Sequence, residues 1–396
     1  MSNTIPLIFR QSDAQFTHGM RDYFGYWDVG VTEATNGAFA VRFGRANGKM
    51  DGIASWHRHE TQFRLLYIVR GWMDFEIEGV GRVRLEQGDG MYQTPGRHRE
   101  VGHSLDCLIM EVVAPAEFRT VGLPEPEVTQ KEGTGRFESA VGSIMYEMNG
   151  PESGPPIVLL HGLGGNRSLW ESQVLALADR FRVVTVDLPG HGGAGPLKPG
   201  ASIGDVGQAV GALVEHLGLQ QVHMAGLSLG ASVALAAVSK IPEKIRSLVL
   251  CSAAIYVPPE ARGQWVARAD MALDNKEKLW APVLSRWLSD GFASVHQDQV
   301  ESLCQAFRQS DPGSYAEYCK SASTSDLRVH AAKVRVPVFI ITGNEDVLAG
   351  PPVARDIQEL IAGSRVVEIP DARHLPNIEQ EQKFNLLMRD WLNSQD

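Results

Sequence analysis

The pattern of hydrophobic and polar positions changes once along this chain. Between about residues 37 and 113, short runs with alternating apolar and polar residues, or with β-branched residues, are separated by glycine-rich turns. These runs cover residues 64–69, 72–77, 82–85 and 105–113. Such spacing predicts short antiparallel strands in a small barrel or sandwich.

Beyond residue 141 the chain reads as short, mostly apolar runs that alternate with helical stretches. The runs cover residues 157–160, 183–186, 222–225, 248–251, 336–341 and 366–369. Strands of this kind are buried on both faces, which predicts a mostly parallel sheet with helices on both sides. Amphipathic helical sequence interrupts the alternation between about 258 and 332. This insertion predicts a helical cap over the carboxyl edge of the sheet, where ligands bind in open α/β folds.

The change of pattern divides the chain into two predicted domains. A chain of 396 residues also exceeds the usual size of one hydrophobic core. The sequence between the two patterns is rich in Pro, Glu, Gly, Thr and Lys and cannot bury much apolar surface. We therefore expect an all-β domain at 1–118, a linker at 119–140 and an α/β domain at 141–396.

Composition and charge narrow the class of protein. Hydrophobic residues make up 43% of the chain and charged residues 21%, which is typical of a globular protein. The net charge of −10 argues against nucleic acid and anionic membranes as partners. The start of the chain lacks a basic segment followed by a long apolar core, and no apolar run approaches the length needed to cross a bilayer. The four cysteines form no Cys-x-x-Cys pair. These features predict a cytoplasmic protein with reduced thiols.

One motif points to nucleophilic catalysis. Ser228 lies at the centre of Gly-Leu-Ser-Leu-Gly at 226–230, after an apolar strand and before a helix of small residues. This context is that of a nucleophile elbow, a strained turn that presents the hydroxyl group at the edge of a sheet. Ser228 is therefore the predicted nucleophile.

A serine hydroxyl group needs a base to remove its proton and an acid to orient that base. His374 follows the last predicted strand, and Asp346 follows the strand at 336–341. The chain order Ser, Asp, His agrees with a triad on an α/β sheet. We predict His374 as the base and Asp346 as the acid, with Glu345 as the alternative acid.

Two further groups of residues complete the predicted site. The glycine run at 161–165 follows the first strand of the α/β domain and offers backbone donors for an oxyanion. We assign the oxyanion hole to the N–H groups of Leu163 and Leu229. Trp265 and Trp287 of the cap are candidates for the substrate pocket, with ordinary core packing as the alternative. The predicted chemistry needs a small-molecule substrate and no cofactor.

The α/β domain resembles the 3-oxoadipate enol-lactonase branch of the α/β-hydrolases over about residues 143–392. The shared stretches are HGLGGNRSLW at 161–170, DLPGHGGAG at 187–195, GLSLG at 226–230, SDPGSYAEYC at 310–319, STSDLR at 323–328 and DARHLPNIEQ at 371–380. The resemblance implies an α/β-hydrolase that cleaves a small lactone or ester, of the enol-lactone type found in aromatic catabolism, through an acyl-enzyme. Cleavage of a carbon–carbon bond in a 1,3-dicarbonyl is the alternative, because the same triad is sufficient for it.

Three histidines mark the all-β domain. His57 and His59 alternate on one predicted strand and can point to the same ion, while His98 arrives from a neighbouring strand. The segment 51–118 resembles the cupins, which implies a jelly-roll barrel with a divalent metal (Fe, Ni, Cu, Zn or Mn). Cupins usually add a Glu or Gln ligand, but Arg64 stands at that position here, with Gln62 and Glu60 as alternatives.

The cupin resemblance leaves the role of the first domain open. A metal-dependent oxygenase could supply its product to the hydrolase. Alternatively, the domain could be a non-catalytic module that binds a ligand or forms a homodimer.

Overall fold

The computed structural model describes residues 7–18, 21, 23–50, 52–78, 80–93, 96–123 and 133–396. The chain divides into two compact units, Met1–Pro126 and Glu127–Asp396, each with its own hydrophobic core. We describe each unit by itself.

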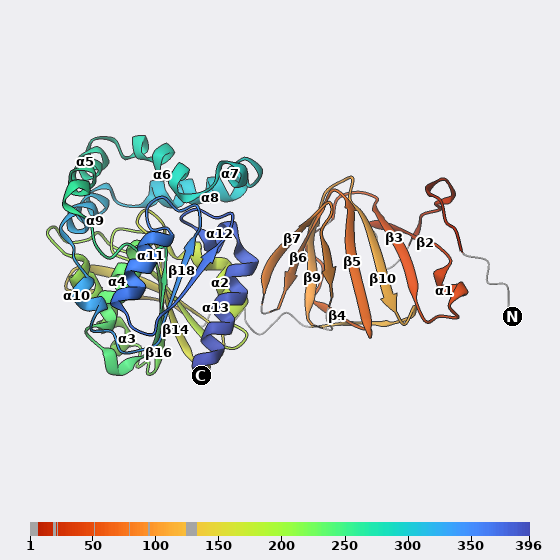
Figure 1. Cartoon of the computed structure of the whole chain (residues 1–396), viewed down its shortest axis with the longest axis horizontal. Coiled ribbons are helices and arrows are strands. Elements are labelled where there is room, and N and C mark those ends of the chain that lie inside the picture. Colours follow the sequence, from red (N-terminus) through yellow and green to blue (C-terminus); the bar gives the residue numbers. More distant parts are fainter. Residues whose placement is uncertain are drawn as a thin grey trace. The chain divides into compact units, whose positions relative to one another are not determined.

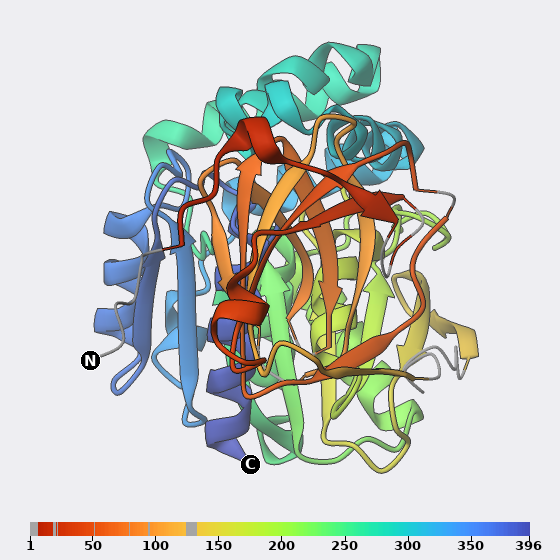
Figure 2. The same ribbon diagram turned by 90° about the vertical axis from the view of Figure 1, so that its right-hand side faces the viewer.

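The first unit is built from two antiparallel sheets (Figures 1 and 2). One sheet has the order β1 (Thr17–His18), β2 (Phe24–Asp28), β3 (Ala40–Ala46), β10 (Leu108–Ala114), β5 (Phe63–Arg70) and β8 (Gly90–Tyr92). The other has the order β11 (Arg119–Gly122), β4 (His57–Glu60), β9 (His98–His103), β6 (Trp72–Ile77) and β7 (Gly81–Glu86). One apolar core takes side chains from both sheets, among them Phe24, Ile68 and Phe75, so the two sheets enclose it together. The prediction of an all-β region is confirmed.

The helical parts of the first unit are short. Among the described residues of this unit, they are the 3-10 turn η1 (Gln11–Asp13) and the one-turn helix α1 (Val31–Ala34). Strand β5 alternates buried and exposed residues along most of its length, as expected for a strand with one face on a core. Arg64 and Leu66 are consecutive members of its buried side, so a charged residue occupies an interior position.

The second unit is an α/β fold around an eight-stranded sheet. The strand order is β12 (Gly133–Ser139), β13 (Gly142–Asn149), β15 (Arg182–Asp187), β14 (Pro156–Leu160), β16 (Val222–Leu227), β17 (Ile245–Cys251), β18 (Val338–Gly343) and β19 (Arg365–Ile369). Strand β13 is antiparallel to both neighbours, and all pairs from β15 to β19 are parallel. Strands β16 and β18 are buried at every residue, which agrees with the predicted coverage on both faces.

Helices cover both faces of this sheet (Figure 1). One face carries α2 (Glu171–Leu177) and α13 (Glu381–Gln395), and the other carries α3 (Ile203–His216), α4 (Leu229–Val238) and α11 (Pro351–Leu360). Short elements η3 (Arg167–Trp170), η4 (Pro242–Lys244) and α12 (Pro376–Glu379) connect them. The part of the chain that the structure describes contains no helix long and apolar enough to cross a membrane.

A group of helices between β17 and β18 forms the cap (Figure 1). These helices are α5 (Pro259–Asn275), η5 (Lys276–Leu279), α6 (Trp280–Trp287), α7 (Asp290–Val295), α8 (Gln297–Gln309), α9 (Pro312–Thr324) and α10 (Arg328–Ala331). Figure 1 shows α5 to α8 gathered at one end of the second unit. They occupy the interval that the amphipathic pattern at about 258–332 indicated.

The predicted linker at 119–140 is too long at both ends. Strand β11 pairs with β4 of the first unit, and strand β12 pairs with β13 of the second. The alternating polar residues of these edge strands resemble linker sequence because one face of an edge strand lies in solvent. The rest of the predicted linker, 124–132, lies outside the described residues.

Candidate active site

The backbone around Ser228 makes an abrupt change from strand to helix. Strand β16 ends at Leu227, helix α4 begins at Leu229, and Ser228 between them has φ 54° and ψ −112°. A Cβ atom on Gly226 would lie 2.2 Å from the carbonyl oxygen of Gly230, and one on Gly230 would lie 2.2 Å from that of Leu160. Only glycine fits at these two positions, which explains the spacing of the motif.

Ser228, His374 and Asp346 lie together in one chain of hydrogen bonds. The Nε2 atom of His374 is 2.8 Å from the hydroxyl oxygen of Ser228, and Nδ1 is 2.7 Å from Oδ2 of Asp346. The other oxygen of Asp346 accepts hydrogen bonds from the backbone N–H groups of Leu348 and Ala349. The alternative acid, Glu345, is exposed, whereas Asp346 is buried.

The surroundings of Asp346 favour its charged form. Burial opposes ionisation of this carboxyl group, but the charge of His374 and the hydrogen bonds from His374 and the backbone outweigh it. The pKa of Asp346 is therefore lower than its ordinary value. An ionised Asp346 accepts a hydrogen bond from the N–H group at Nδ1 of His374, which leaves the lone pair of Nε2 free to accept a proton from Ser228.

The predicted oxyanion donors, Leu163 and Leu229, both line the same cavity as Ser228 and His374. Within the described residues, neither backbone N–H group has a hydrogen-bond acceptor. The loop that carries Leu163 is fixed by His191, whose Nε2 accepts a 3.0 Å hydrogen bond from the N–H of Gly164. Burial holds the pKa of His191 well below its ordinary value, so the ring stays neutral and can accept this bond.

His191 is a site residue that sequence analysis did not single out. The glycines at 190–193 are typical of a tight turn, and the role of His191 follows only from its contact with Gly164, 27 residues away in the chain. The signal in the sequence was a second histidine beside glycines, after a second strand. A histidine among glycines indicates a turn, but it does not show that the ring of His191 supports the loop at Gly164.

The cavity beside Ser228 has a volume of about 370 Å³ and extends under the cap. Both predicted tryptophans, Trp265 and Trp287, line it. Two cap arginines, Arg268 and Arg286, also line it, and sequence analysis did not predict them because they belong to no motif. The residues that line the cavity include no Asp or Glu.

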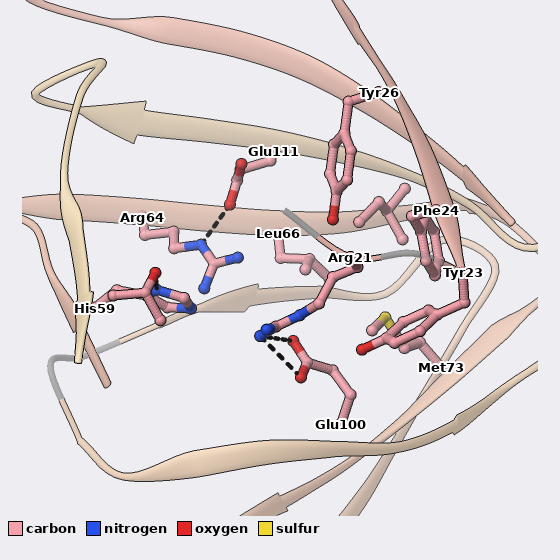
Figure 3. Close-up of a pocket in the computed structure, with 12 residues that line it drawn as sticks. Arg21, Tyr23, Phe24, Tyr26, His59, Arg64, Leu66, Met73, Glu100 and Glu111 are labelled. Atoms are coloured by element: carbon pink, nitrogen blue, oxygen red, sulfur yellow. Dashed lines mark hydrogen bonds and ion pairs between the residues drawn. The ribbon is translucent and has the colours of Figure 1, made fainter. Parts of the chain in front are cut away.

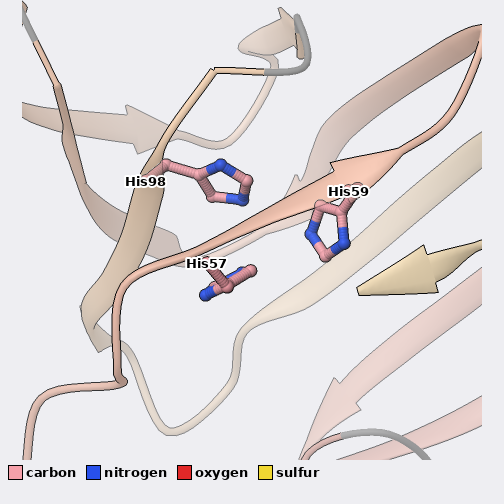
Figure 4. A group of neighbouring side chains, drawn as sticks. All are labelled: His57, His59 and His98. Atoms are coloured by element: carbon pink, nitrogen blue, oxygen red, sulfur yellow. The ribbon is translucent and has the colours of Figure 1, made fainter. Parts of the chain in front are cut away.

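The three histidines of the first unit also lie together (Figure 4). One ring nitrogen from each of His57, His59 and His98 lies within 4.8 Å of the others, and all three side chains are buried. Each Nδ1 atom faces an oxygen: the carbonyl of Ser55 at 2.8 Å, the hydroxyl of Thr120 at 2.9 Å and the carbonyl of Gly96 at 3.0 Å, respectively.

These contacts fix the form of the rings. A carbonyl oxygen can only accept, so Nδ1 of His57 and of His98 carries the proton and Nε2 carries the lone pair. The Nε2 atoms of His59 and His98 are buried and have no partner among the described residues. Burial lowers the pKa of His98 to about 4, so its ring is neutral near pH 7.

The residues that were considered as a further ligand in the first unit lie elsewhere. Glu60 and Gln62 are exposed. Arg64 is buried and pairs with Glu111 and Gln93, so its charge is compensated inside the unit and not by Glu60. The carboxylate next to the cluster belongs to Glu100, whose Oε1 atom is 3.8 Å from Nε2 of His57.

Sequence analysis did not identify Glu100, although a signal was present. His98 and Glu100 alternate on strand β9 as His57 and His59 do on β4, and both are buried. Alternate residues of a strand share a face, so the pair could have been assigned to the interior.

Comparison with known proteins identifies the family to which the second unit belongs. The sequence model of the family described as alpha/beta hydrolase fold matches residues 155–381. The 3-oxoadipate enol-lactonase 1 of Acinetobacter baylyi is 29% identical over 243 residues, which cover 61% of this chain and 90% of that protein. A pimeloyl-(acyl-carrier protein) methyl ester esterase of Neisseria meningitidis is 27% identical over 61% of this chain and 95% of its own. The crystal structure of the enol-lactonase from Burkholderia xenovorans LB400 has 31% identity and a TM-score of 0.61, over 64% of this chain and 99% of that one.

The glycine requirement at the turn can be tested by Gly230→Ala. The added methyl group meets backbone atoms that cannot rotate away, so we expect a loss of at least about 2 kcal/mol in the free energy of unfolding. Chemical denaturation measures this loss. The control is Gly263→Ala, where nothing lies within 4 Å and alanine should stabilise helix α5 by up to about 1 kcal/mol. Equal stabilities of the two variants would contradict the close packing at Gly230.

Proposed function

Because the chain belongs to the α/β-hydrolase family, we propose that it is a serine hydrolase that cleaves a small lactone or ester carrying a carboxylate group. The observation that carries the proposal is the chain of hydrogen bonds from Ser228 through His374 to Asp346. This chain of hydrogen bonds begins at Ser228, in the wall of the cavity that Trp265 and Trp287 also line. The enol-lactonases and esterases among the relatives support the choice of a lactone or ester.

The proposed reaction has two stages. In the first, His374 takes the proton of Ser228 while the serine oxygen attacks the carbonyl carbon of the substrate, and the C–O bond of the lactone or ester breaks. His374 then gives the proton to the departing oxygen. In the second stage, His374 takes a proton from water, the water attacks the acyl-enzyme, and Ser228 recovers its proton as the acid is released.

Backbone amides would stabilise the negative oxygen that forms in each stage. The N–H groups of Leu163 and Leu229 have no other acceptor among the described residues and lie at the same wall as Ser228. Preorganised donors of this kind need no rearrangement when the charge develops. His191 supports this arrangement from outside the cavity, because it holds the glycine loop through Gly164.

Two arginines that have no acidic partner in the described part of the chain support a negatively charged substrate. Arg268 donates to the hydroxyl group of Tyr315, and Arg286 forms no ion pair among the described residues. Burial and the nearby charge of Arg268 lower the pKa of Arg286. Partly buried like charges without a counter-ion are unfavourable, and a carboxylate on the substrate would relieve that cost.

The nucleophile is tested by Ser228→Ala. Within the residues that the structure describes, no other hydroxyl group is bonded to His374, so we expect turnover of lactones and aryl esters to fall by at least about three powers of ten. The matched control is Ser232→Ala, one helical turn away in the same cavity, whose hydroxyl group bonds the carbonyl of Ala254 instead. Near-normal turnover in Ser228→Ala would exclude this serine as the nucleophile.

The charge of the substrate is tested by Arg286→Met with two matched substrates, a lactone that bears a carboxylate and its neutral amide. A hydrogen bond to a charged group contributes about 1.5–3 kcal/mol, so kcat/KM for the acid should fall by at least about tenfold. We expect little change for the amide. The surface variant Arg262→Met, on the same cap helix α5 as Arg268, controls for net charge. Equal losses for both substrates would mean that Arg286 does not recognise a carboxylate.

We also propose that the first unit binds one divalent metal through His57, His59 and His98. The donors fit such an ion, because the rings lie within 4.8 Å of one another at their ligand atoms and Nδ1 of each is held by an oxygen. Oxygen partners of this kind orient histidine ligands in metal sites. Imidazole suits Fe, Ni, Cu or Zn, any of which would supply a Lewis acid, and Fe or Cu also a redox centre. A cupin jelly roll, an oxygenase reaction and a homodimer through this unit stay predictions.

The metal proposal is tested by elemental analysis of the purified protein and of His57→Ala/His59→Ala. We expect about one ion per chain in the first and none in the second, because one imidazole holds a metal poorly. Chelation should leave ester hydrolysis unchanged, since the reaction at Ser228 uses proton transfer and backbone donors. Equal metal content in both proteins would exclude the site.

A further inference from the structure

The side chain of Arg21 reaches into the interior of the first unit (Figure 3). Arg21 belongs to the connection between β1 and β2, which pair as a hairpin. Its Nη2 atom donates to both oxygens of Glu100, at 3.0 and 3.1 Å, and lies 2.8 Å from Nε2 of His57. The guanidinium group therefore bridges the carboxylate and the histidine cluster.

The contact with His57 defines which group donates. An arginine has no acceptor atom, so Nε2 of His57 accepts this hydrogen bond. The same conclusion follows from Nδ1, which faces the carbonyl oxygen of Ser55 and must carry the proton. The lone pair on Nε2 of His57, which a metal would need, is thus already used by Arg21.

One lone pair cannot serve two partners. The Nε2 atoms of His59 and His98 have no hydrogen-bond partner in the described part of the first unit, while that of His57 is bonded to a cation. A divalent ion among the three rings would lie beside the positive charge of Arg21, and both would repel each other in a buried space. Arg21 and a metal bound to His57 therefore exclude one another.

Glu100 is the group that Arg21 binds and that a metal ion would bind in its place. Its carboxylate is buried, and Arg21 is the cation bonded to it. Its Oε1 atom lies 3.8 Å from Nε2 of His57, and two bonds of about 2.0–2.2 Å to one ion can bridge such a separation. If Arg21 left, Glu100 would remain as an unpaired buried carboxylate, which favours a new cation at the same place.

We propose that Arg21 occupies the position of a cation in the metal-free protein, and that metal binding displaces it from His57 and leaves Glu100 as an additional ligand. This inference rests on the proposed three-histidine metal site. It adds Arg21 as a residue that lowers the affinity of that site for metal, and Glu100 as an anionic ligand. Such a ligand is otherwise missing, because Arg64 on strand β5 stands where cupins usually have Glu or Gln.

Displacement of Arg21 would also change the cavity next to the cluster. That cavity has a volume of about 220 Å³ and is lined by Arg21, His59, Arg64 and Glu100, with Tyr23 and Tyr26 further along its wall (Figure 3). Metal binding would thus enlarge the space beside the ion. Because Arg21 lies in the connection between β1 and β2, its displacement would also shift this hairpin.

The test measures the affinity for Co²⁺ by calorimetry in the full-length protein, after removal of bound metal. Arg21→Ala and Arg21→Met should bind at least about tenfold more tightly than the wild type, because a charged donor no longer competes for the lone pair. The control Arg58→Ala removes the same charge from the outer face of β4 and should leave the affinity unchanged. Millimolar guanidinium ion should weaken Co²⁺ binding in Arg21→Ala and not in the wild type.

The outcomes separate the two proposals. Equal affinities in the wild type and both Arg21 variants would overturn the exchange and leave the three-histidine site intact. Absence of binding in all of them would overturn both proposals. Binding only in the Arg21 variants would mean that Arg21 blocks the site in the wild type, which would overturn its displacement by metal.

A second measurement needs no substitution. Trypsin cleaves after arginine only when the side chain is accessible, so saturating Co²⁺ should raise the rate of cleavage after Arg21 in the wild type. His57→Ala/His59→Ala should show no such change. An unchanged rate in the metal-loaded wild type would overturn the displacement of Arg21 even if the substituted proteins failed to fold.

Discussion

The second unit depends on one constrained residue, Ser228, whose backbone has a positive φ of 54° between a strand and a helix. A non-glycine residue adopts such a conformation only when its surroundings impose it. Here the close approach of Gly226 to Gly230, and of Gly230 to Leu160, imposes it. As a result the hydroxyl group meets His374 at the carboxyl edge of the sheet, and the N-terminus of helix α4 lies beside it. The positive end of a helix favours negative charge nearby, which suits a reaction that develops an oxyanion.

The features that could be predicted from the sequence are those that a local pattern determines. The strands β16 and β18 are mostly apolar and buried at every residue, and the elbow, Asp346 and His374 each follow a strand in a fixed order. Helices on both faces of the sheet followed from the same alternation. The all-β nature of the first unit followed from short alternating runs, and three of its histidines could be grouped because two share a strand.

The features that could not be predicted depend on contacts between distant segments. His191 supports a loop 27 residues away, and Arg286 matters only because no acidic residue lines the same cavity. Arg21 reaches Glu100 across 79 residues of sequence. The linker was predicted too long because edge strands β11 and β12 carry the polar composition of a loop. In each case the deciding information is a distance in space, which a single sequence does not contain.

The paired arginines of the cap have a consequence for the end of the catalytic cycle. Hydrolysis of a lactone or ester creates a new carboxylate, so the product of an acidic substrate carries one more negative charge than the substrate did. Arg268 and Arg286 would therefore attract the product at least as strongly as the substrate. Departure of the product, and not bond cleavage, would then limit the turnover rate, and dissolved salt would speed it by screening the attraction.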